Sequence, residues 1–129
     1  MTTKPAWSHL PNARHIDAVL ADVRKRPGAW DAAWGAAWGA ARDAAQRAAR
    51  TAARGAAWGA AWGAAWDAAR DAARDAAWDA IAALIAWDST ADLLECTPDV
   101  LRTMIDLAEP PVCHQAALLL PYAIVRMHA

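Results

Sequence analysis

Apolar residues recur at helical spacing near both ends of the chain. Ile16, Val19 and Leu20 follow Asn12, a candidate N-cap, and predict a short amphipathic helix within residues 13–26. Pro27 ends this helix, because proline disfavours the helical conformation in the residue before it. Apolar residues at the same spacing near the other end predict a helical cap of three short helices over residues 89–129.

The three C-terminal helices carry boundary signals of their own. Ser89 or Thr90 is placed to cap the first, and Thr97 followed by Pro98 marks the start of the second, since proline suits the first helical turn. Residues 113–127 are expected to form the third helix, with a kink at Pro121.

Between these ends the chain repeats in units of four residues. Thirteen tetrads run without insertion from Trp30 to Ile81. The third position is always Ala, and the fourth is Ala in every tetrad but the last. Alanine at this density favours helix, so we expect a tetrad-repeat helical region over residues 29–88. Slippage of a twelve-nucleotide repeat is an alternative origin for part of this regularity.

The order of residues at the first tetrad position favours one long helix. A period of four drifts by about 40° per tetrad around a helix of 3.6 residues per turn. After Trp38, where the drifting row would turn toward solvent, its residues change from Trp to Arg. They return to Trp at Trp58, where the row turns back. A continuous helix over 29–87 would be about 87 Å long. Such a helix must either break or be covered by other copies of the chain.

The tetrad row is also a palindrome about residue 48. Two antiparallel copies crossing there would bring like Trp blocks together, and a hairpin within one chain would do the same. Residues 46–50 contain no Gly, Pro or Asn on which to turn. This favours the antiparallel dimer over the hairpin.

Composition indicates an all-α fold in a single helical domain over residues 1–129. The chain has nine Trp, one Tyr and no Phe, and few residues that favour strands outside its two ends. The N-terminal residues lack the pattern of a secretion signal, and no uncharged stretch approaches the ~20 residues that span a bilayer. We therefore expect a cytoplasmic protein with no transmembrane segment.

Charge is divided unevenly along the chain, although the net charge is only −1. Residues 1–54 carry nine Lys or Arg against four Asp, and residues 55–129 carry four Arg against ten Asp or Glu. Such halves attract each other within or between chains, although chance variation of solvated faces is the plainer interpretation. The aspartates at 67, 71, 75 and 79 alternate with Arg, and we expect them to form a solvated face.

Trp and Gly within the repeat are interpreted as helix-packing residues. Glycine costs about 1 kcal/mol relative to alanine in an exposed helix, but at four-residue spacing it lets another helix backbone approach closely. A neighbouring Trp buries roughly 150–250 Å² on such a partner. We therefore expect a homo-oligomer, with an antiparallel dimer favoured, or binding of another protein. The predicted interface comprises Trp30, Trp34, Trp38, Trp58, Trp62 and Trp66 with Gly35, Gly39, Gly55, Gly59 and Gly63.

The alternative function is binding of a nucleotide or other small ligand in a cleft lined by Trp and Arg. Aromatic rings stack on bases while Arg contacts phosphate. The slightly negative net charge argues against a nucleic-acid partner. The local basic cluster that would serve such a ligand comprises Arg42, Arg47, Arg50 and Arg54.

The sequence offers no catalytic, metal or cofactor residues. It lacks a phosphate-binding glycine loop, a nucleophile elbow and a His-Glu-x-x-His motif. Its histidines and cysteines match no zinc-binding spacing: His9, His15, His114 and His128, with Cys96 and Cys113. We therefore expect a non-enzymatic interaction or assembly protein without a cofactor.

Three segments resemble a known kind of repeat protein. They are Trp-Asp-Ala-Ala-Trp (30–34), Ala-Trp-Asp-Ala-Ile-Ala-Ala-Leu-Ile-Ala-Trp-Asp (77–88) and Ala-Ala-Leu-Leu-Leu-Pro (116–121). They are similar to segments of uncharacterised Ala/Trp-rich tetrapeptide-repeat proteins of bacteria and bacteriophages. The resemblance implies no activity and no functional residues. It implies only a small bacterial or phage accessory factor that acts by binding.

Overall fold

The computed structural model describes residues 5–56 and 60–127, apart from the side chains of residues 40, 55–56, 60–62 and 74–76. The described residues form helices and connecting segments, which confirms the all-α class. No helix among them is long and apolar enough to cross a membrane. The elements are α1 (Ala13–Lys25), α2 (Pro27–Ala56), α3 (Ala60–Ala86), the 3₁₀ helix η1 (Asp88–Leu93), α4 (Pro98–Leu107) and α5 (Val112–Met127).

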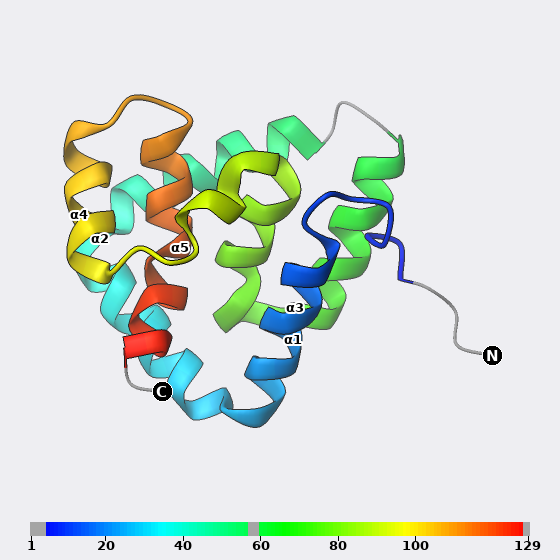
Figure 1. Cartoon of the computed structure of the whole chain (residues 1–129), viewed down its shortest axis with the longest axis horizontal. Coiled ribbons are helices and arrows are strands. Elements are labelled where there is room, and N and C mark those ends of the chain that lie inside the picture. Colours follow the sequence, from blue (N-terminus) through cyan, green and yellow to red (C-terminus); the bar gives the residue numbers. More distant parts are fainter. Residues whose placement is uncertain (1–4, 57–59, 128–129) are drawn as a thin grey trace.

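Helix α5 lies at the centre of the fold. It packs against α2, α3 and α4 (Figure 1), and Leu118, Leu119 and Leu120 are fully buried at three successive positions. A helix that is apolar on every side has to be covered on every side. The buried amide of Gln115 donates hydrogen bonds to Ser89 Oγ at 2.9 Å and Thr90 Oγ1 at 3.2 Å. These bonds join α5 to η1.

Helices α1 and α4 begin where the sequence predicts, but Asn12 has a different role from the one expected. Thr97 caps α4 by accepting a hydrogen bond from the backbone N–H of Val100 at 3.3 Å, with Pro98 as the first helical residue. Asn12 makes no capping bond to α1. Its side chain instead donates to the carbonyl oxygens of Leu84, Trp87 and Asp88 at 3.0, 3.3 and 3.1 Å. Asn12 thereby joins the start of α1 to the last turn of α3 and to the start of η1.

The capping residues expected for the first C-terminal helix, which is η1 in the structure, are also corrected. Neither Ser89 nor Thr90 begins η1, whose N-cap position is Trp87. Thr90 is fully buried, and its hydroxyl donates to the carbonyl oxygen of Ala83 at 2.7 Å. The threonine therefore ties η1 back to α3 rather than capping a new helix.

Of the two outcomes expected for a repeat helix over 29–87, a break or a cover of other copies, the structure has the break. The repeat divides into α2 and α3, which pack against each other. The backbone of α2 is also non-helical at Ala41, where φ is −144° and ψ is 37°, and Figure 1 shows α2 changing direction part-way along its length. Division of the repeat lets alanine faces pack within one chain, because Ala48 and Ala52 of α2 share a core cluster with Ala82 and Ala83 of α3.

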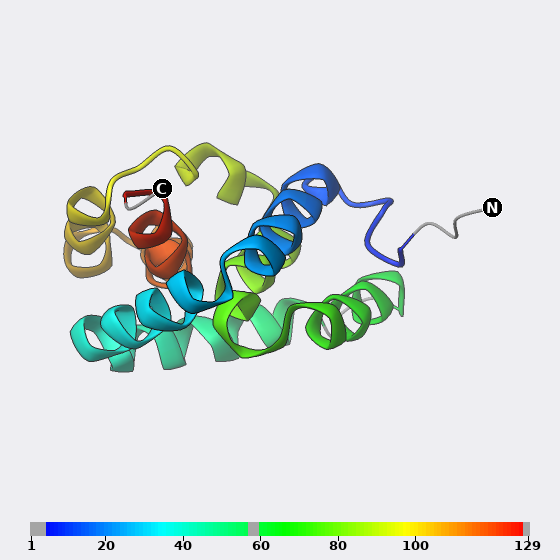
Figure 2. The ribbon, with the colours of Figure 1, turned by 90° about the horizontal axis from the view of Figure 1, so that it is seen from below.

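Helix α3 is itself sharply bent. Trp66 and Trp78 are twelve positions apart, and a straight helix would separate their Cα atoms by about 18 Å along its axis. Their ring centroids are 4.6 Å apart with an interplanar angle of 84°. The two parts of α3 therefore lie side by side, as the green ribbon in Figure 1 shows. In the view of Figure 2, the later part of α3 lies below α1, and α2 lies below α5.

Candidate interaction face and arginine-lined hollows

Trp30 belongs to the core of the chain itself. It is fully buried, and its ring centroid lies 6.2 Å from that of Tyr122. Its Nε1 donates a hydrogen bond of 2.7 Å to Asp22 Oδ2. The first of the six tryptophans expected at an interface between chains therefore has no exposed surface here.

Trp34 and Trp38 form a half-buried pair on α2. Their ring centroids are 5.1 Å apart at an interplanar angle of 40°, and the indole nitrogen of Trp38 donates a hydrogen bond of 3.4 Å to the carboxylate of Asp79. Asp79 is buried, which corrects the expectation that it belongs to a solvated aspartate face; Asp67 and Asp71 are exposed. Burial raises the pKa of Asp79 to about 6, and the indole N–H of Trp38 acts in the opposite direction.

A strip of small residues on α2 is exposed beside this pair. Apart from the adjoining residues and the backbone of the same helix, no described atom lies within 4 Å of the position that a Cβ would take at Gly35 or Gly39. The strip extends over roughly three helical turns at the spacing that places residues on one helix face. We call it the α2 face, and it comprises Gly28, Ala32, Gly35, Ala36 and Gly39.

The remaining residues of the expected interface lie elsewhere. Gly63 is half-buried in α3, and Trp66 is half-buried against Trp78. Ala48, the centre of the palindrome, is fully buried within the chain, so the crossing point expected for two copies is already covered. The side chain of Trp62 and the environments of Gly55, Trp58 and Gly59 lie outside the described residues.

A hollow of about 540 Å³ opens where α2 is non-helical. Arg42 and Asp43 line it from α2, and Arg102 and Asp106 line it from α4. Arg102 also forms an exposed salt bridge of 3.1 Å with Asp99 in its own helix. The α4 residues were not singled out from the sequence, because nothing local in 102–106 indicates that this helix faces the bend of α2.

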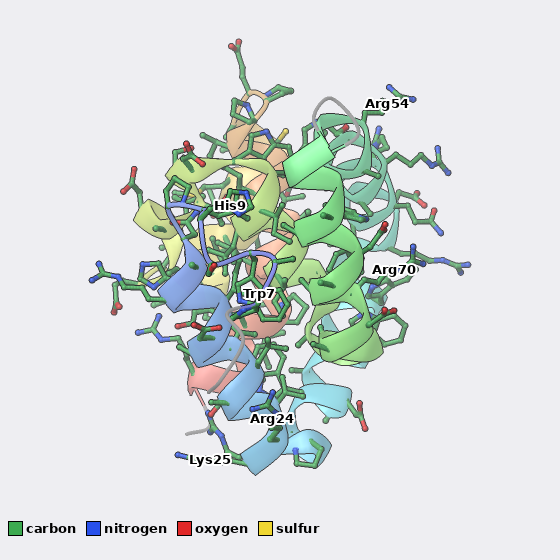
Figure 3. The ribbon with its side chains drawn as sticks, turned by 90° about the vertical axis from the view of Figure 1, so that its right-hand side faces the viewer. Trp7, His9, Arg24, Lys25, Arg54 and Arg70 are labelled. Carbon is green, nitrogen blue, oxygen red and sulfur yellow. The ribbon has the colours of Figure 1, made fainter. Side chains whose placement is uncertain are left out.

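A second hollow of about 280 Å³ adjoins the first and shares Asp43 with it. Arg47 and Arg50 line the second hollow, so three of the four arginines expected to bind a ligand surround the two openings. Arg54 lines neither, and Figure 3 shows it pointing away from the body of the molecule. Together the two hollows present four arginines and two aspartates.

His114 lies near this basic region. Its ring stacks on Trp87 with centroids 6.3 Å apart and an interplanar angle of 13°. Burial lowers the pKa of His114, and the positive charge of Arg47 lowers it further. Neutral His114 thus adds no charge to the hollows at neutral pH, so the arginines set their electrostatic character.

The described residues offer no site for a metal ion. They contain no group of three or more His, Cys, Asp or Glu side chains placed to hold one. Cys96 and Cys113 are both half-buried free thiols.

Searches against family models, curated proteins and solved structures find no match for this chain.

Proposed function

We propose that this chain is a non-enzymatic interaction and assembly protein that self-associates through the α2 face and the half-exposed Trp34–Trp38 pair beside it. The observation that carries the proposal is the open space around Gly35 and Gly39. Each glycine costs about 1 kcal/mol relative to alanine in an exposed helix, yet no contact with the rest of the described residues requires the Cβ to be absent. Close approach of a second helix gives these glycines a physical role.

Unpaired charges support a second copy of the chain as the partner. Arg42, Arg47, Arg50 and Arg54 are exposed on α2, and Asp67 and Asp71 are exposed on α3. Among the described residues, none of these six takes part in a salt bridge. In a two-fold dimer, basic α2 of one protomer meets acidic α3 of its partner twice, since the contact is isologous.

The test replaces both glycines by a bulky residue. Gly35→Leu with Gly39→Leu leaves the monomer folded, because the new side chains enter open space, and prevents close approach of the second helix. Sedimentation velocity should show an oligomer for the wild type and a monomer for the variant, with unchanged circular dichroism for both. Ala21→Leu is the matched control, since Ala21 is also an exposed helical alanine but lies on α1, outside the α2 face and the charged segments of α2 and α3. Equal sedimentation of wild type and double variant rules the proposal out.

A second candidate function is binding of a small polyanionic ligand, such as a nucleotide, in the adjoining hollows. The observation that favours it is the convergence of Arg42 and Arg102 on one opening and Arg47 and Arg50 on the next. Guanidinium groups pair with phosphate oxygens through two parallel hydrogen bonds.

Arg54 provides the control for this second candidate. A bound ligand raises the melting temperature of the folded protein, so ATP and a short oligothymidylate should stabilise the wild type. The Arg47→Glu plus Arg50→Glu variant should lose this stabilisation, and Arg54→Glu should keep it. If neither ligand moves the wild-type melting temperature, or if all three proteins respond alike, the hollows bind no such ligand.

A further inference from the structure

A separate cavity of about 220 Å³ lies between α1, the end of η1 and α5. It shares no residue with the α2 face or the two hollows. Ala18, Val19 and Leu94 form its apolar wall. Its volume is below the roughly 300–1,000 Å³ of pockets that take drug-sized molecules, so any occupant is small.

The one carboxylate in the cavity wall is already engaged. Asp22 Oδ1 accepts hydrogen bonds from Arg26 Nε at 3.0 Å and Nη2 at 2.8 Å. Its Oδ2 accepts from Arg26 Nη2 at 2.8 Å and from the indole nitrogen of Trp30 at 2.7 Å. Asp22 is therefore neutralised by its own neighbours and offers little to a cationic occupant.

The opposite side of the cavity presents hydrogen-bond donors. Arg126 donates from Nη1 to the carbonyl oxygen of Leu94 and from Nη2 to Glu95 Oε2 at 2.8 Å. A guanidinium carries five N–H groups, so these two bonds leave donors for another acceptor. The side chains of His15 and Tyr122, both in the wall, form no hydrogen bond with any residue in 5–56 or 60–127.

The tyrosine hydroxyl keeps its proton at neutral pH. Burial raises the pKa of Tyr122; the charge of Arg126 opposes this shift, and the charges of Glu95 and Asp22 reinforce it. Arg126 Cζ lies over the ring of Tyr122, 5.7 Å from its centroid, so a guanidinium and a tyrosine with a protonated hydroxyl together form the α5 side of the cavity wall.

We propose that this cavity binds a small organic carboxylate, held by Arg126 and the Tyr122 hydroxyl, with its apolar part against Val19 and Leu94. The surplus of donors over acceptors selects an anion, and the apolar wall selects an organic anion over a fully hydrated inorganic one. The limited volume excludes nucleotides, which separates this site from the arginine-lined hollows.

Tyr122 provides a direct measurement, because it is the only tyrosine in the chain. Protein labelled with ring-¹³C tyrosine gives one set of aromatic resonances, and these report on the cavity. Titration with benzoate should shift them along a saturating curve for one site. Benzamide, which has the same shape without the charge, and inorganic phosphate, which has charge without an apolar part, should each bind more weakly by about tenfold or more, since removal of a charged hydrogen bond or of apolar burial has an effect of this order.

Two variants assign the binding to Arg126. Arg126→Gln should weaken benzoate binding by about tenfold or more, and Arg126→Lys should weaken it less because the charge remains. Glu95→Gln is the opposite change: it removes the carboxylate that competes with the ligand for Arg126, and benzoate should bind as tightly as to the wild type or more tightly. Circular dichroism checks that each variant is folded. An unsaturable response of the wild type, equal affinity of benzamide or phosphate, or undiminished binding by both Arg126 variants overturns the proposal.

Discussion

The indole nitrogen of Trp38 donates a hydrogen bond of 3.4 Å to Asp79 Oδ2, 41 positions further along the chain. The bond joins α2 to α3. It also places a buried carboxylate directly behind the tryptophan pair that borders the α2 face. At 3.4 Å the bond is long, and it offsets only part of the cost of burying the carboxylate, whose pKa remains raised to about 6.

Asp79 should make the fold less stable as pH rises. Its pKa is about 6 in the folded chain against an ordinary value of 3.8, so the folded state holds the proton more tightly than the unfolded state. This contribution to stability is complete below about pH 4 and is lost as pH rises through about 6, with a total on the order of 2–3 kcal/mol.

The Asp79→Asn variant isolates this effect. Urea unfolding should show the variant gaining stability over the wild type between pH 4 and pH 7, because the amide cannot ionise. The difference between the two proteins is the relevant quantity, since the lowered pKa of His114 acts in the opposite direction over part of this range. Asp71→Asn, at an exposed position, should lack the gain. A difference that is constant with pH would show that Asp79 is not desolvated in the folded chain.

Replacing Gly35 or Gly39 by alanine should stabilise the monomer. Alanine restricts the unfolded chain and favours helix, and the space at both sites accommodates a Cβ, so each substitution should add about 0.4–1 kcal/mol. Urea unfolding at a concentration low enough to dissociate any oligomer measures this directly. Destabilisation of the dilute protein would reveal a contact within the chain that requires the glycine.

The bend in α3 is tested by coupling Trp66 to Trp78. Rings in edge-to-face contact contribute about 0.5–1.5 kcal/mol beyond the area they bury, so a double-mutant cycle with Trp66→Leu and Trp78→Leu should give an interaction energy in this range. Residues about 18 Å apart on a straight helix would be independent. An interaction energy near zero would therefore mean that α3 is straight in solution.

Asn12 should be important for stability although it caps no helix. Its amide donates to three carbonyl oxygens around the end of α3, and it is buried. Asn12→Asp replaces the donor by a carboxylate facing those oxygens and should cost about 2–3 kcal/mol in urea unfolding at neutral pH. Most of the loss should be recovered at low pH, where the carboxyl is protonated and can donate. Equal stability of the wild type and variant at neutral pH would place the Asn12 side chain in solvent.

The sequence predicts the elements that carry distinctive boundary residues. Thr97 and Pro98 locate the start of α4, and Pro27 separates α1 from α2, because each restricts the backbone in a way its neighbours do not. The repeat contains no such signal. Ala41 is non-helical although it lies between Ala40 and Arg42, two residues that favour helix, so the position of this break is determined by packing, chiefly against α5, rather than by local preference.

The same limit applies to the candidate sites. The drift of the tetrad row treats the repeat as straight, and it therefore places Trp30 toward a second chain, whereas the structure buries it against Tyr122. The cluster of arginines is visible in the sequence, but its partner Arg102 comes from α4 and becomes a neighbour only when α2 bends. Asp79 repeats the residue type of Asp67 and Asp71, so its burial follows from the fold alone.

A native mass spectrum of freshly purified protein tests self-association most directly, because it counts subunits and detects retained ligand together. The expected result is a dimer or higher oligomer that the Gly35→Leu plus Gly39→Leu variant converts to a monomer and that Ala21→Leu leaves intact. A wild-type chain that remains monomeric at every concentration would contradict assembly through the α2 face. In that case, added mass on the monomer would indicate a bound ligand, and the function would be ligand binding in the arginine-lined hollows or in the cavity beside Tyr122.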